Sequence, residues 1–372
     1  MKICALRLKE FVAKAFLLVL AATILPMAAG AAPGQGQSWK FAVTDDSRAG
    51  GSAYWGSNGV STVVLGAIAN DIVKQGVDFV LFPGDMITGE INDSSELSKQ
   101  LDKWVATMKP IYQAGIPLYV TRGGHEYNPL VHSAANPADP SRETFLAHFD
   151  MPKNGPDGEK GLTWSFTHKN AKVVGFDTYA NRTDKFDDRL FAPGSNKGQM
   201  MNPWVIDEIK KFPAEVNFVI AHEQMWATIS HFDTFANDPD SRDALAAVLA
   251  THNGTYFAGH DHMYVRGFLQ KNNGLRTPIF TVGTAGAGNY DYNFLDVFRA
   301  GYPGPYEFVG QMSLAHAAKP VFGYLLVTVN PDGTWSGEFR GSVPPGWGTA
   351  DTTMPPFTTM DSFTSTGMLN WP

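Results

Sequence analysis

The sequence predicts an α/β protein whose strands are buried on both faces. From residue 38 onward, short apolar runs alternate with amphipathic segments long enough to form helices, which is the pattern of this fold class. The runs are apolar almost throughout, as expected of strands that are covered on both sides. A chain of 372 residues, 44% hydrophobic and 12% aromatic, can also bury a large core. We therefore expect one large domain or two closely packed halves.

In the first half of the chain, three apolar runs predict strands and the amphipathic segments that follow them predict helices. WKFAVTDD begins the pattern, VDFVLFPGD continues it, and PLYVTRGGHE ends it. A short helix is expected inside an inserted segment at 127–160. The predicted strands are 39–46, 77–85 and 117–126, and the predicted helices are 61–76, 96–115 and 142–149.

The second half repeats the alternation. Two apolar runs separated by a single residue predict a hairpin, and Pro203 stands at the start of a helical segment, where proline is favoured. A final predicted hairpin turns at Pro331-Asp332-Gly333. The predicted strands are 163–169, 171–179, 216–223, the run ending at Ala258, 277–288 and the hairpin 322–341, and the predicted helices are 202–211 and 241–253.

The first 32 residues have the features of a secretory signal peptide. Basic residues precede the apolar run at 15–25, and small residues at 28–32 offer a cleavage site. The run is short for a membrane span, which needs about 20 apolar residues. Cys4, the only cysteine, precedes the run, so no disulfide is expected in the mature chain. We expect a protein exported through a Sec-type pathway, periplasmic or extracellular, with no membrane anchor in the mature chain.

The mature chain is expected to form one domain at 33–342, followed by an irregular tail at 343–372 that is rich in Pro, Thr and Gly. Without the leader it carries 25 basic and 35 acidic residues, a net charge of −10. This balance excludes the basic footprint of a nucleic-acid-binding protein. We find no internal repeat and no heptad run, which argues against a solenoid or a coiled coil.

Polar side chains with metal-binding chemistry follow five of the predicted strands. Taken singly, each is more often a turn, cap or surface residue. Together they are expected to converge, because the carboxyl ends of strands in an open α/β sheet meet at one crevice. A mixture of carboxylates and imidazoles suits Mn, Fe or Zn. The residues are Asp46, Asp85, His125, His222 and the pair His260 and His262.

The spacing of the two last histidines supports a shared target. Residues two apart in extended backbone point to the same side, so His260 and His262 can both face one metal cluster. Gly259 and Gly84 precede candidate ligands and let the backbone approach closely, since glycine has no Cβ.

Five motifs in order make the chain similar to the calcineurin-like metallophosphoesterase superfamily. FAVTDD, GDMITG, RGGHE, IAHE and AGHDH match its pattern of an Asp strand, GD, GNH followed by D or E, a lone His, and GHxH. The match covers roughly residues 39–290. GHDHMYVR resembles most closely the purple acid phosphatase branch, in which an aromatic residue and Arg follow GHxH.

The resemblance implies a fold, a cofactor and a reaction. The fold is a two-sheet αββα sandwich of the metallophosphoesterase type, and the cofactor is two divalent or mixed-valence ions of Fe, Mn or Zn. Asp46, Asp85 and His262 would hold one ion, and Asp85, His222 and His260 the other, with Asp85 bridging. His125 would act at the leaving-group oxygen as a general acid or as a hydrogen-bond donor in the transition state, and Glu126 would orient it. The substrate would be a small phosphoester, attracted by the metal charge despite the acidic protein.

Three positions depart from the family pattern. Many members have a ligating His where this chain has Arg48, the purple branch has a ligating Tyr where this chain has Thr88, and Gly124 replaces an Asn that ligates the second ion. Arg48 is either a phosphate-binding fork at the mouth of the site or a surface residue paired with an Asp. With Gly124 a depleted second site is expected, which a Gly124→Asn change would strengthen.

Two neighbours of the motifs are candidates to replace the missing ligands. Asn128 follows the third motif, and Asp45 precedes Asp46. In an extended strand, Asp45 would point to the face opposite Asp46, so little compensation is expected from it.

The sequence therefore favours a secreted, metal-dependent phosphoester hydrolase. The alternative is a non-catalytic or weakly active member of the fold that binds metal or phosphate, and the departures at Arg48, Thr88 and Gly124 motivate it. A purely structural secreted domain fits the composition but leaves the five strand-end motifs unexplained.

Overall fold

The structure, a computed structural model, describes most of the chain between residues 36 and 368. The described residues are 36–49, 59–89, 94–127, 140–180, 200–211, 214–226, 235, 238–288, 305–312, 320–344 and 353–368. The predicted signal peptide lies outside them. Within these ranges, no helix combines the length and the apolar character that crossing a membrane requires.

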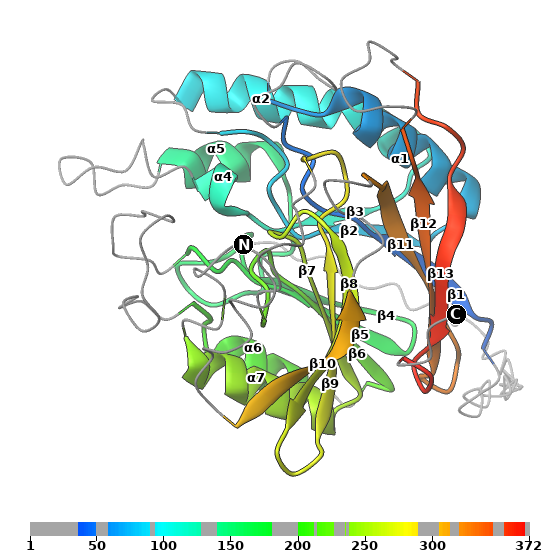
Figure 1. Ribbon diagram of the computed structural model, residues 1–372. Coiled ribbons are helices and arrows are strands. Elements are labelled where there is room, and N and C mark those ends of the chain that lie inside the picture. The colour runs from blue at the N-terminus through cyan, green and yellow to red at the C-terminus, as the bar shows by residue number, and fades with distance from the viewer. Residues whose placement is uncertain are drawn as a thin grey trace, which may run out of the picture.

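Two mixed β-sheets face each other at the centre of the molecule (Figure 1). The first has the strand order β13-β12-β11-β1-β2-β3 and the second the order β10-β8-β9-β7-β6-β5-β4. The first sheet consists of β1 (Trp39–Val43), β2 (Phe79–Phe82), β3 (Leu118–Val120), β11 (Phe322–Val329), β12 (Trp335–Ser342) and β13 (Thr358–Thr364). The second consists of β4 (Trp164–His168), β5 (Ala171–Gly175), β6 (Val216–Ile220), β7 (Gly254–Ala258), β8 (Tyr264–Lys271), β9 (Arg276–Val282) and β10 (Tyr306–Met312).

Helices cover the outer faces of both sheets. Those on the first sheet include α1 and α2, where Trp104 of α2 packs on Phe82 of β2. Helix α7 packs on β7 and β9 of the second sheet, and α6 packs on β5. The predicted αββα sandwich is therefore confirmed. The helices are α1 (Thr62–Gln75), α2 (Ser94–Thr107), α3 (Lys109–Gln113), α4 (Gly124–Tyr127), α5 (Pro140–His148), α6 (Trp204–Lys211) and α7 (Pro239–Thr251).

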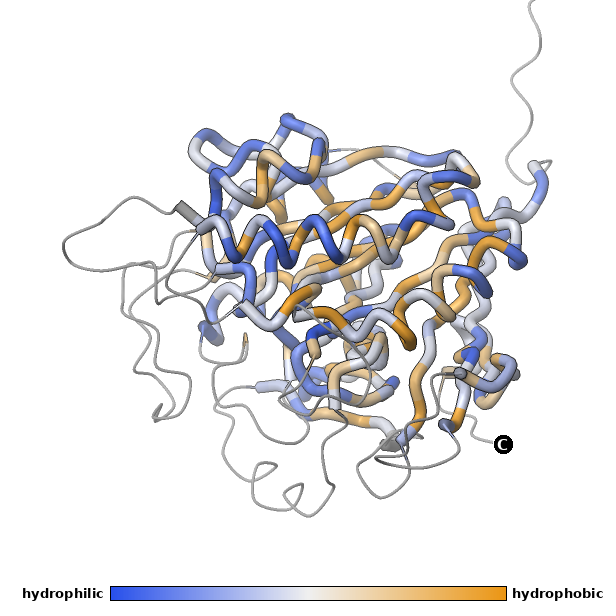
Figure 2. The backbone as a smooth tube through the Cα atoms, turned by 90° about the horizontal axis from the view of Figure 1, so that it is seen from above, coloured by the Kyte–Doolittle hydropathy of each residue, from blue (hydrophilic) through white to orange (hydrophobic). Residues whose placement is uncertain are grey.

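Helix α1 shows how the local sequence produces this arrangement. Its buried residues include Leu65, Ile68 and Ile72, whose spacing of three and four places them on one face. The helix ends at Gly76, which adopts a left-handed conformation with φ 63° and donates its N–H to the carbonyl of Val73. Figure 2 shows the general pattern, in which strands are mostly apolar and helices alternate polar with apolar residues.

Aromatic side chains fill the space between the two sheets. Phe41 of the first sheet contacts Phe218 of the second, with ring centroids 4.8 Å apart, and Phe218 also contacts Trp335. Phe280 stacks on Phe363 of β13 at 5.4 Å. These rings are all buried. Because large aromatic side chains remove much apolar area from water, this layer holds the sheets together.

The strand directions bring the candidate site residues to one edge of the sandwich. In the first sheet β1, β2 and β3 are parallel, and in the second β5, β6, β7 and β9 are parallel. The two sheets meet at the carboxyl ends of β1 and β9, where the N–H of Asp45 donates to the carbonyl of Val282 at 3.0 Å. The loops that follow these strands therefore share one region.

Two of the predicted elements are divided in the structure. The predicted helix at 96–115 is broken between α2 and α3, because Pro110 has no N–H to continue the helical hydrogen-bond pattern. The predicted strand at 117–126 ends at Val120, and residues 124–127 form the helical turn α4. The other predicted strands and helices are present with boundaries shifted by a few residues.

The segment predicted to be an irregular tail contains β13, which extends the edge of the first sheet. Asp361 of β13 is 2% exposed and accepts hydrogen bonds from the Tyr264 hydroxyl at 2.9 Å and from Arg266 Nε at 2.7 Å. Both donors lie on β8 of the other sheet and are fully buried. Since a buried charge needs a partner, these contacts fix β13 in the fold, although its Thr-rich sequence has little apolar periodicity.

Candidate metal centre

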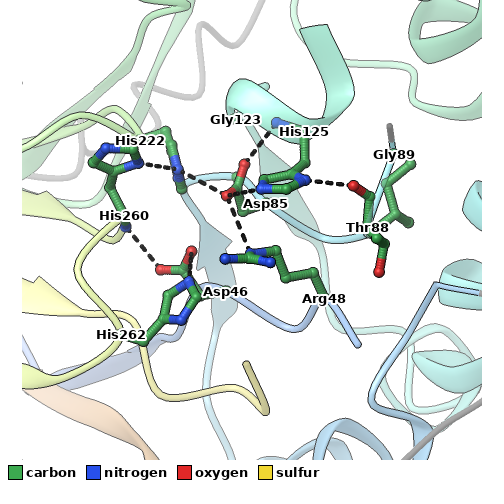
Figure 3. A network of polar contacts seen from close by, with 12 residues as sticks. Asp46, Arg48, Asp85, Thr88, Gly89, Gly123, His125, His222, His260 and His262 are labelled. Carbon is green, nitrogen blue, oxygen red and sulfur yellow. Dashed lines mark hydrogen bonds and ion pairs between the residues drawn. The ribbon is translucent and has the colours of Figure 1, made fainter. Parts of the chain in front are cut away.

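Five of the predicted site residues are brought together at the carboxyl ends of four strands (Figure 3). Their side chains point toward a common centre, and all five residues are buried. Asp46 follows β1, Asp85 follows β2, His222 follows β6, and His260 and His262 follow β7. The convergence that the sequence predicts is therefore present in the fold.

Asp85, His222 and His260 form the tighter part of this cluster. Nε2 of His222 lies 3.3 Å from Asp85 Oδ2 and 3.2 Å from Nδ1 of His260. One ligand atom from each residue lies within 4.8 Å of the others, which is the spacing of atoms around a single metal ion. This trio is the set that the family resemblance implies for the second ion.

The other ring nitrogen of each candidate histidine faces an oxygen. Nδ1 of His222 is 3.2 Å from Asp45 Oδ2, and Nδ1 of His262 is 2.7 Å from the carbonyl of Gly288. Nε2 of His260 is 3.7 Å from Glu223 Oε2. An oxygen acceptor at the outer nitrogen favours a proton there, so the inner nitrogen is the one that can act as a metal ligand.

This arrangement fits a cation. With their outer nitrogens protonated, His222 and His260 direct two lone pairs at each other across 3.2 Å, beside the Asp85 carboxylate. Two such lone pairs and an anion repel one another unless a positive charge lies among them. Imidazole nitrogens with a carboxylate oxygen are ligands that Zn, Fe and Mn all accept.

Asp46 and His262 form the other part of the cluster. Oδ2 of Asp46 accepts the N–H of His260 at 2.8 Å, whereas its Oδ1 is buried and has no hydrogen-bond partner among the described residues. His262 Nε2 lies 3.5 Å from that Oδ1. A buried carboxylate oxygen next to an imidazole lone pair fits the first ion of the predicted pair.

The structure corrects the expectation that Asp45 points away from the site. Asp46 has φ 61°, a left-handed conformation that interrupts the alternation of the strand, so both aspartates face inward. Asp45 is part of a second group with Asp46 and His222 whose ligand atoms lie within 4.8 Å of one another. Its oxygens are already engaged, however, by the N–H of Gly84 at 2.6 Å and by His222. We therefore assign Asp45 to holding His222.

Left-handed backbone conformations also occur at the candidate ligands His260 and Asp85, and at His260 this changes how the histidine pair reaches the site. His260 has φ 70°, and residues 260–263 form a bend. The prediction that His260 and His262 face the site through the side-chain alternation of an extended strand is therefore wrong. Asp85 has φ 43°. Strained conformations at non-glycine residues persist where the surrounding structure enforces them, and they concentrate at functional sites.

Gly84 and Gly259 allow the close approaches that the sequence predicts. A Cβ at Gly259 would overlap the carboxylates of Asp45 and Asp46. A Cβ at Gly84 would overlap the backbone of Gly123, the residue directly before the helical turn α4 that carries His125. Any larger residue at either position would push two loops of the site apart.

His125 lies at the mouth of the centre. Its Nε2 is 3.7 Å from Asp85 Oδ2, and its side chain is 17% exposed, whereas the ring of His222 is fully buried. Its Nδ1 donates to the carbonyl of Thr88, which fixes the ring. Glu126, predicted to orient His125, instead accepts hydrogen bonds from the N–H groups of Met86 and Gly123, each at 2.8 Å. It therefore binds the two loops to each other.

Arg48 also faces the centre rather than the outer surface. Its Nε lies 3.9 Å from Asp85 Oδ2, and its side chain is 20% exposed. Burial and the nearby Arg48 charge both lower the pKa of His262. Arg48 and His125 thus place two partly exposed groups beside a buried ligand set, and the aspartate with which Arg48 pairs is the candidate ligand Asp85.

The charges of the ligand set are strongly coupled. Burial favours the neutral form of Asp85, but His222, His125 and Arg48 outweigh it and hold the pKa of this carboxyl well below its ordinary value. Burial likewise opposes protonation of His222, yet Asp85 and Asp45 raise its pKa well above the ordinary value. The two shifts have opposite directions and one common cause, the contact of the His222 ring with the Asp85 carboxylate.

The two other departures from the family pattern also have structural partners. The hydroxyl of Thr88 donates to the carbonyl of Ala49 at 2.7 Å and so does not replace a tyrosine ligand. Beside Gly124 lies the hydroxyl of Tyr179, 3.1 Å from the position that a Cβ would take. Asn128, considered as a replacement ligand, lies outside the described residues.

Sequence reasoning missed Glu223 as part of the site, and with it the contact between Glu223 and Tyr179. The Tyr179 hydroxyl donates to Glu223 Oε1, and both residues are buried. The sequence did contain a signal for Glu223, because this carboxylate directly follows the predicted ligand His222. Asp45 is adjacent to the predicted ligand Asp46 in the same way. Carboxylates next to histidine ligands commonly accept the outer N–H of the ring. Tyr179 ends a predicted strand without any such signal.

Comparisons with known proteins agree with this fold. The family model for calcineurin-like phosphoesterase matches residues 61–264. Solved structures with a similar fold include PhoD, which is 16% identical with a TM-score of 0.62 over 90% of this chain and 70% of its own. A purple acid phosphatase, PPD1 from yellow lupin (Lupinus luteus) seeds, is 16% identical with a TM-score of 0.56 over 90% of this chain and 54% of its own. No curated protein sequence matches the chain.

Proposed function

The chain belongs to the calcineurin-like phosphoesterase family of metal-dependent phosphoric ester hydrolases, and we propose that it hydrolyses small phosphoesters at a centre of two metal ions. Asp46, Asp85 and His262 would hold one ion, and Asp85, His222 and His260 the other. The proposal rests on the inward-facing oxygen and nitrogen atoms of these residues, above all the contacts of His222 Nε2 with Asp85 and His260.

When bound, the two ions supply Lewis acidity at the phosphate oxygens and lower the pKa of a water molecule that attacks phosphorus. Arg48 would bind the phosphate oxygens with its guanidinium fork, since its Nε faces the same Asp85 oxygen as the ligand set. His125 would give a proton from Nε2 to the leaving-group oxygen while the Thr88 carbonyl holds its Nδ1–H. Both groups reach solvent, so a substrate can contact them.

We expect metal binding to release about one proton from the site at neutral pH. The proton comes from His222, whose pKa is raised in the metal-free protein, because Nε2 must lose it to become a ligand. Asp85 contributes none, since its low pKa keeps it ionised. Affinity should therefore fall as the pH is lowered, when protons compete for His222. Calorimetric titration with Zn²⁺ in buffers of different ionisation enthalpy measures the release, and pH-independent binding without it would contradict this account.

The protein would act in the periplasm or outside the cell. The basic residues, apolar run and small residues within 1–32 support export through a Sec-type signal peptide. Amino-terminal sequencing of the protein from its native host tests this proposal, with the mature chain expected to begin near residue 33.

The decisive test of the function combines metal analysis with hydrolysis. Purified protein is expected to bind Mn, Zn or Fe and to hydrolyse a generic aryl phosphate monoester or diester when that metal is present. Bound metal without any turnover would instead favour the alternative, a non-catalytic binding member of the fold, which the departures at Arg48, Thr88 and Gly124 motivate. Failure to bind any of these metals would contradict both.

A further inference from the structure

Gly124 stands at the position where the family pattern has an Asn ligand, and the side chain of Tyr179 lies in the space beside it. The Tyr179 hydroxyl lies 3.1 Å from the position of a Cβ at Gly124, a tight contact, so a side chain there requires the hydroxyl to shift by a few tenths of an ångström. Gly124 is absent from the residues with positive φ, so its backbone does not itself require glycine. The small residue at 124 is therefore explained by the tyrosine beside it.

Tyr179 connects the space beside Gly124 to a histidine of the metal site through Glu223. Its hydroxyl donates to Glu223 Oε1, and the other oxygen of the same carboxylate, Oε2, is 3.7 Å from Nε2 of His260. His260 in turn directs Nδ1 at His222 Nε2, 3.2 Å away. Both Tyr179 and Glu223 are almost completely buried, which strengthens the interactions of the carboxylate with its neighbours.

We propose that Tyr179 and Glu223 are positioning residues that replace the missing Asn by fixing His260 as a ligand of the second metal ion. Glu223 keeps the proton on Nε2 of His260 and so keeps the Nδ1 lone pair on the ligand side. Tyr179 holds the Glu223 carboxylate in place through Oε1. The second site thus loses one ligand at Gly124 and gains a more firmly oriented histidine. This inference rests on the proposed function, because it concerns the same metal pair.

Truncating Glu223 tests the central contact. Glu223→Ala is expected to weaken binding of the second ion by about 10- to 100-fold, the usual cost of losing an orienting carboxylate. Glu223→Gln should recover part of that loss, because its side-chain oxygen can still lie beside Nε2 of His260, where the Glu223 carboxylate oxygen is 3.7 Å away. Zn²⁺ competition against a chromophoric chelator, with bound ions per chain counted after equilibrium dialysis, measures both effects. Circular dichroism confirms that each variant is folded.

Tyr179→Phe tests the outer contact and has a matched control. It removes only the hydroxyl, and we expect a several-fold loss of second-ion affinity. Tyr324→Phe removes a buried tyrosine hydroxyl that also donates to a carboxylate, Asp71, outside the site, and it should leave metal binding unchanged. A purely structural role for Tyr179 would lower thermal stability in both variants without changing metal affinity in either.

The Asn substitution separates this inference from the simpler view of an empty ligand position. Gly124→Asn is expected to weaken the second site, because its side chain displaces the Tyr179 hydroxyl from Glu223. The sequence alone leads to the opposite expectation, that Asn would strengthen the site. Higher second-ion affinity in Gly124→Asn would overturn the inference.

Two further results of the metal-binding measurements distinguish this inference from the proposed function. Wild-type affinity in Glu223→Ala would overturn the inference and leave the proposed function standing, whereas a wild-type protein that binds no metal would overturn both.

Iron-loaded protein should lack a strong visible charge-transfer band, since Thr88 does not supply a tyrosine ligand and Tyr179 donates to Glu223. A band that disappears in Tyr179→Phe would show that Tyr179 is itself a ligand, and would overturn its assignment as a positioning residue.

Discussion

His222→Ala is expected to lose the second metal ion and to reduce phosphoester hydrolysis by at least about 10³-fold. His222 is the residue whose Nε2 contacts both Asp85 and His260, so its removal separates the remaining ligands. Metal charge is worth several kcal/mol of transition-state stabilisation, and each 1.36 kcal/mol is a factor of ten in rate. His260→Ala should behave similarly. Bound-metal stoichiometry and turnover, measured on the same sample, give the result.

His168→Ala is the matched control for these variants. His168 is a partly buried histidine that also pairs with an aspartate, Asp78, but it lies on β4 at the edge of the second sheet. It should keep both ions and full activity. Wild-type turnover in His222→Ala or His260→Ala would show that the metal centre is wrongly assigned.

His125→Ala is expected to keep both metal ions and to lose about 10²- to 10⁴-fold in rate, the usual contribution of a positioned acid. The reason is its location. His125 Nε2 is 3.7 Å from Asp85, at the partly exposed mouth, and its Nδ1 is held by the Thr88 carbonyl rather than directed at the buried ligands. The loss should be smaller for substrates with a good leaving group, such as an aryl phosphate, than for alkyl phosphates, because a good leaving group needs less protonation.

His148→Ala serves as the control, since the Nδ1 of His148 also contacts a backbone carbonyl, that of Thr144, but lies outside the site. Unchanged metal content together with reduced turnover in His125→Ala alone supports the general-acid role. Loss of metal from His125→Ala, to the extent seen in His222→Ala, would show that His125 is a ligand instead.

The parts of the fold that could be predicted are those with strong local patterns. Buried strands such as β2 and amphipathic helices such as α1 follow from continuous apolar runs and from spacing of three and four. Strands β8, β10 and β13 were missed because their sequences mix polar and apolar residues, and their positions depend on partners far along the chain. Asp361 shows this for β13, since its reason for burial lies in Tyr264 and Arg266.

Site residues could be predicted where an Asp or His stands at the end of a predicted strand, as Asp85 and His222 do. It was not predictable where backbone conformation decides, because the left-handed φ of Asp46 turns Asp45 inward and no propensity indicates it. Nor could sequence reveal that Tyr179 lies beside Gly124, since 55 residues separate them and the contact exists only after β5 has joined the sheet.

The contact between β13 and β8 has a consequence for the order in which the protein is made and folded. Arg266 and Asp361 are 95 residues apart, so a ribosome working at about 5–20 residues per second produces the arginine about 5–20 s before its partner. During that interval the guanidinium has no carboxylate from β13, and burying it alone would be costly. We therefore expect the second sheet to close over Arg266 only after β13 has been made. Synthesis of β13, rather than growth of the amino-terminal half, then sets the earliest moment at which water can be excluded from the space between the two sheets.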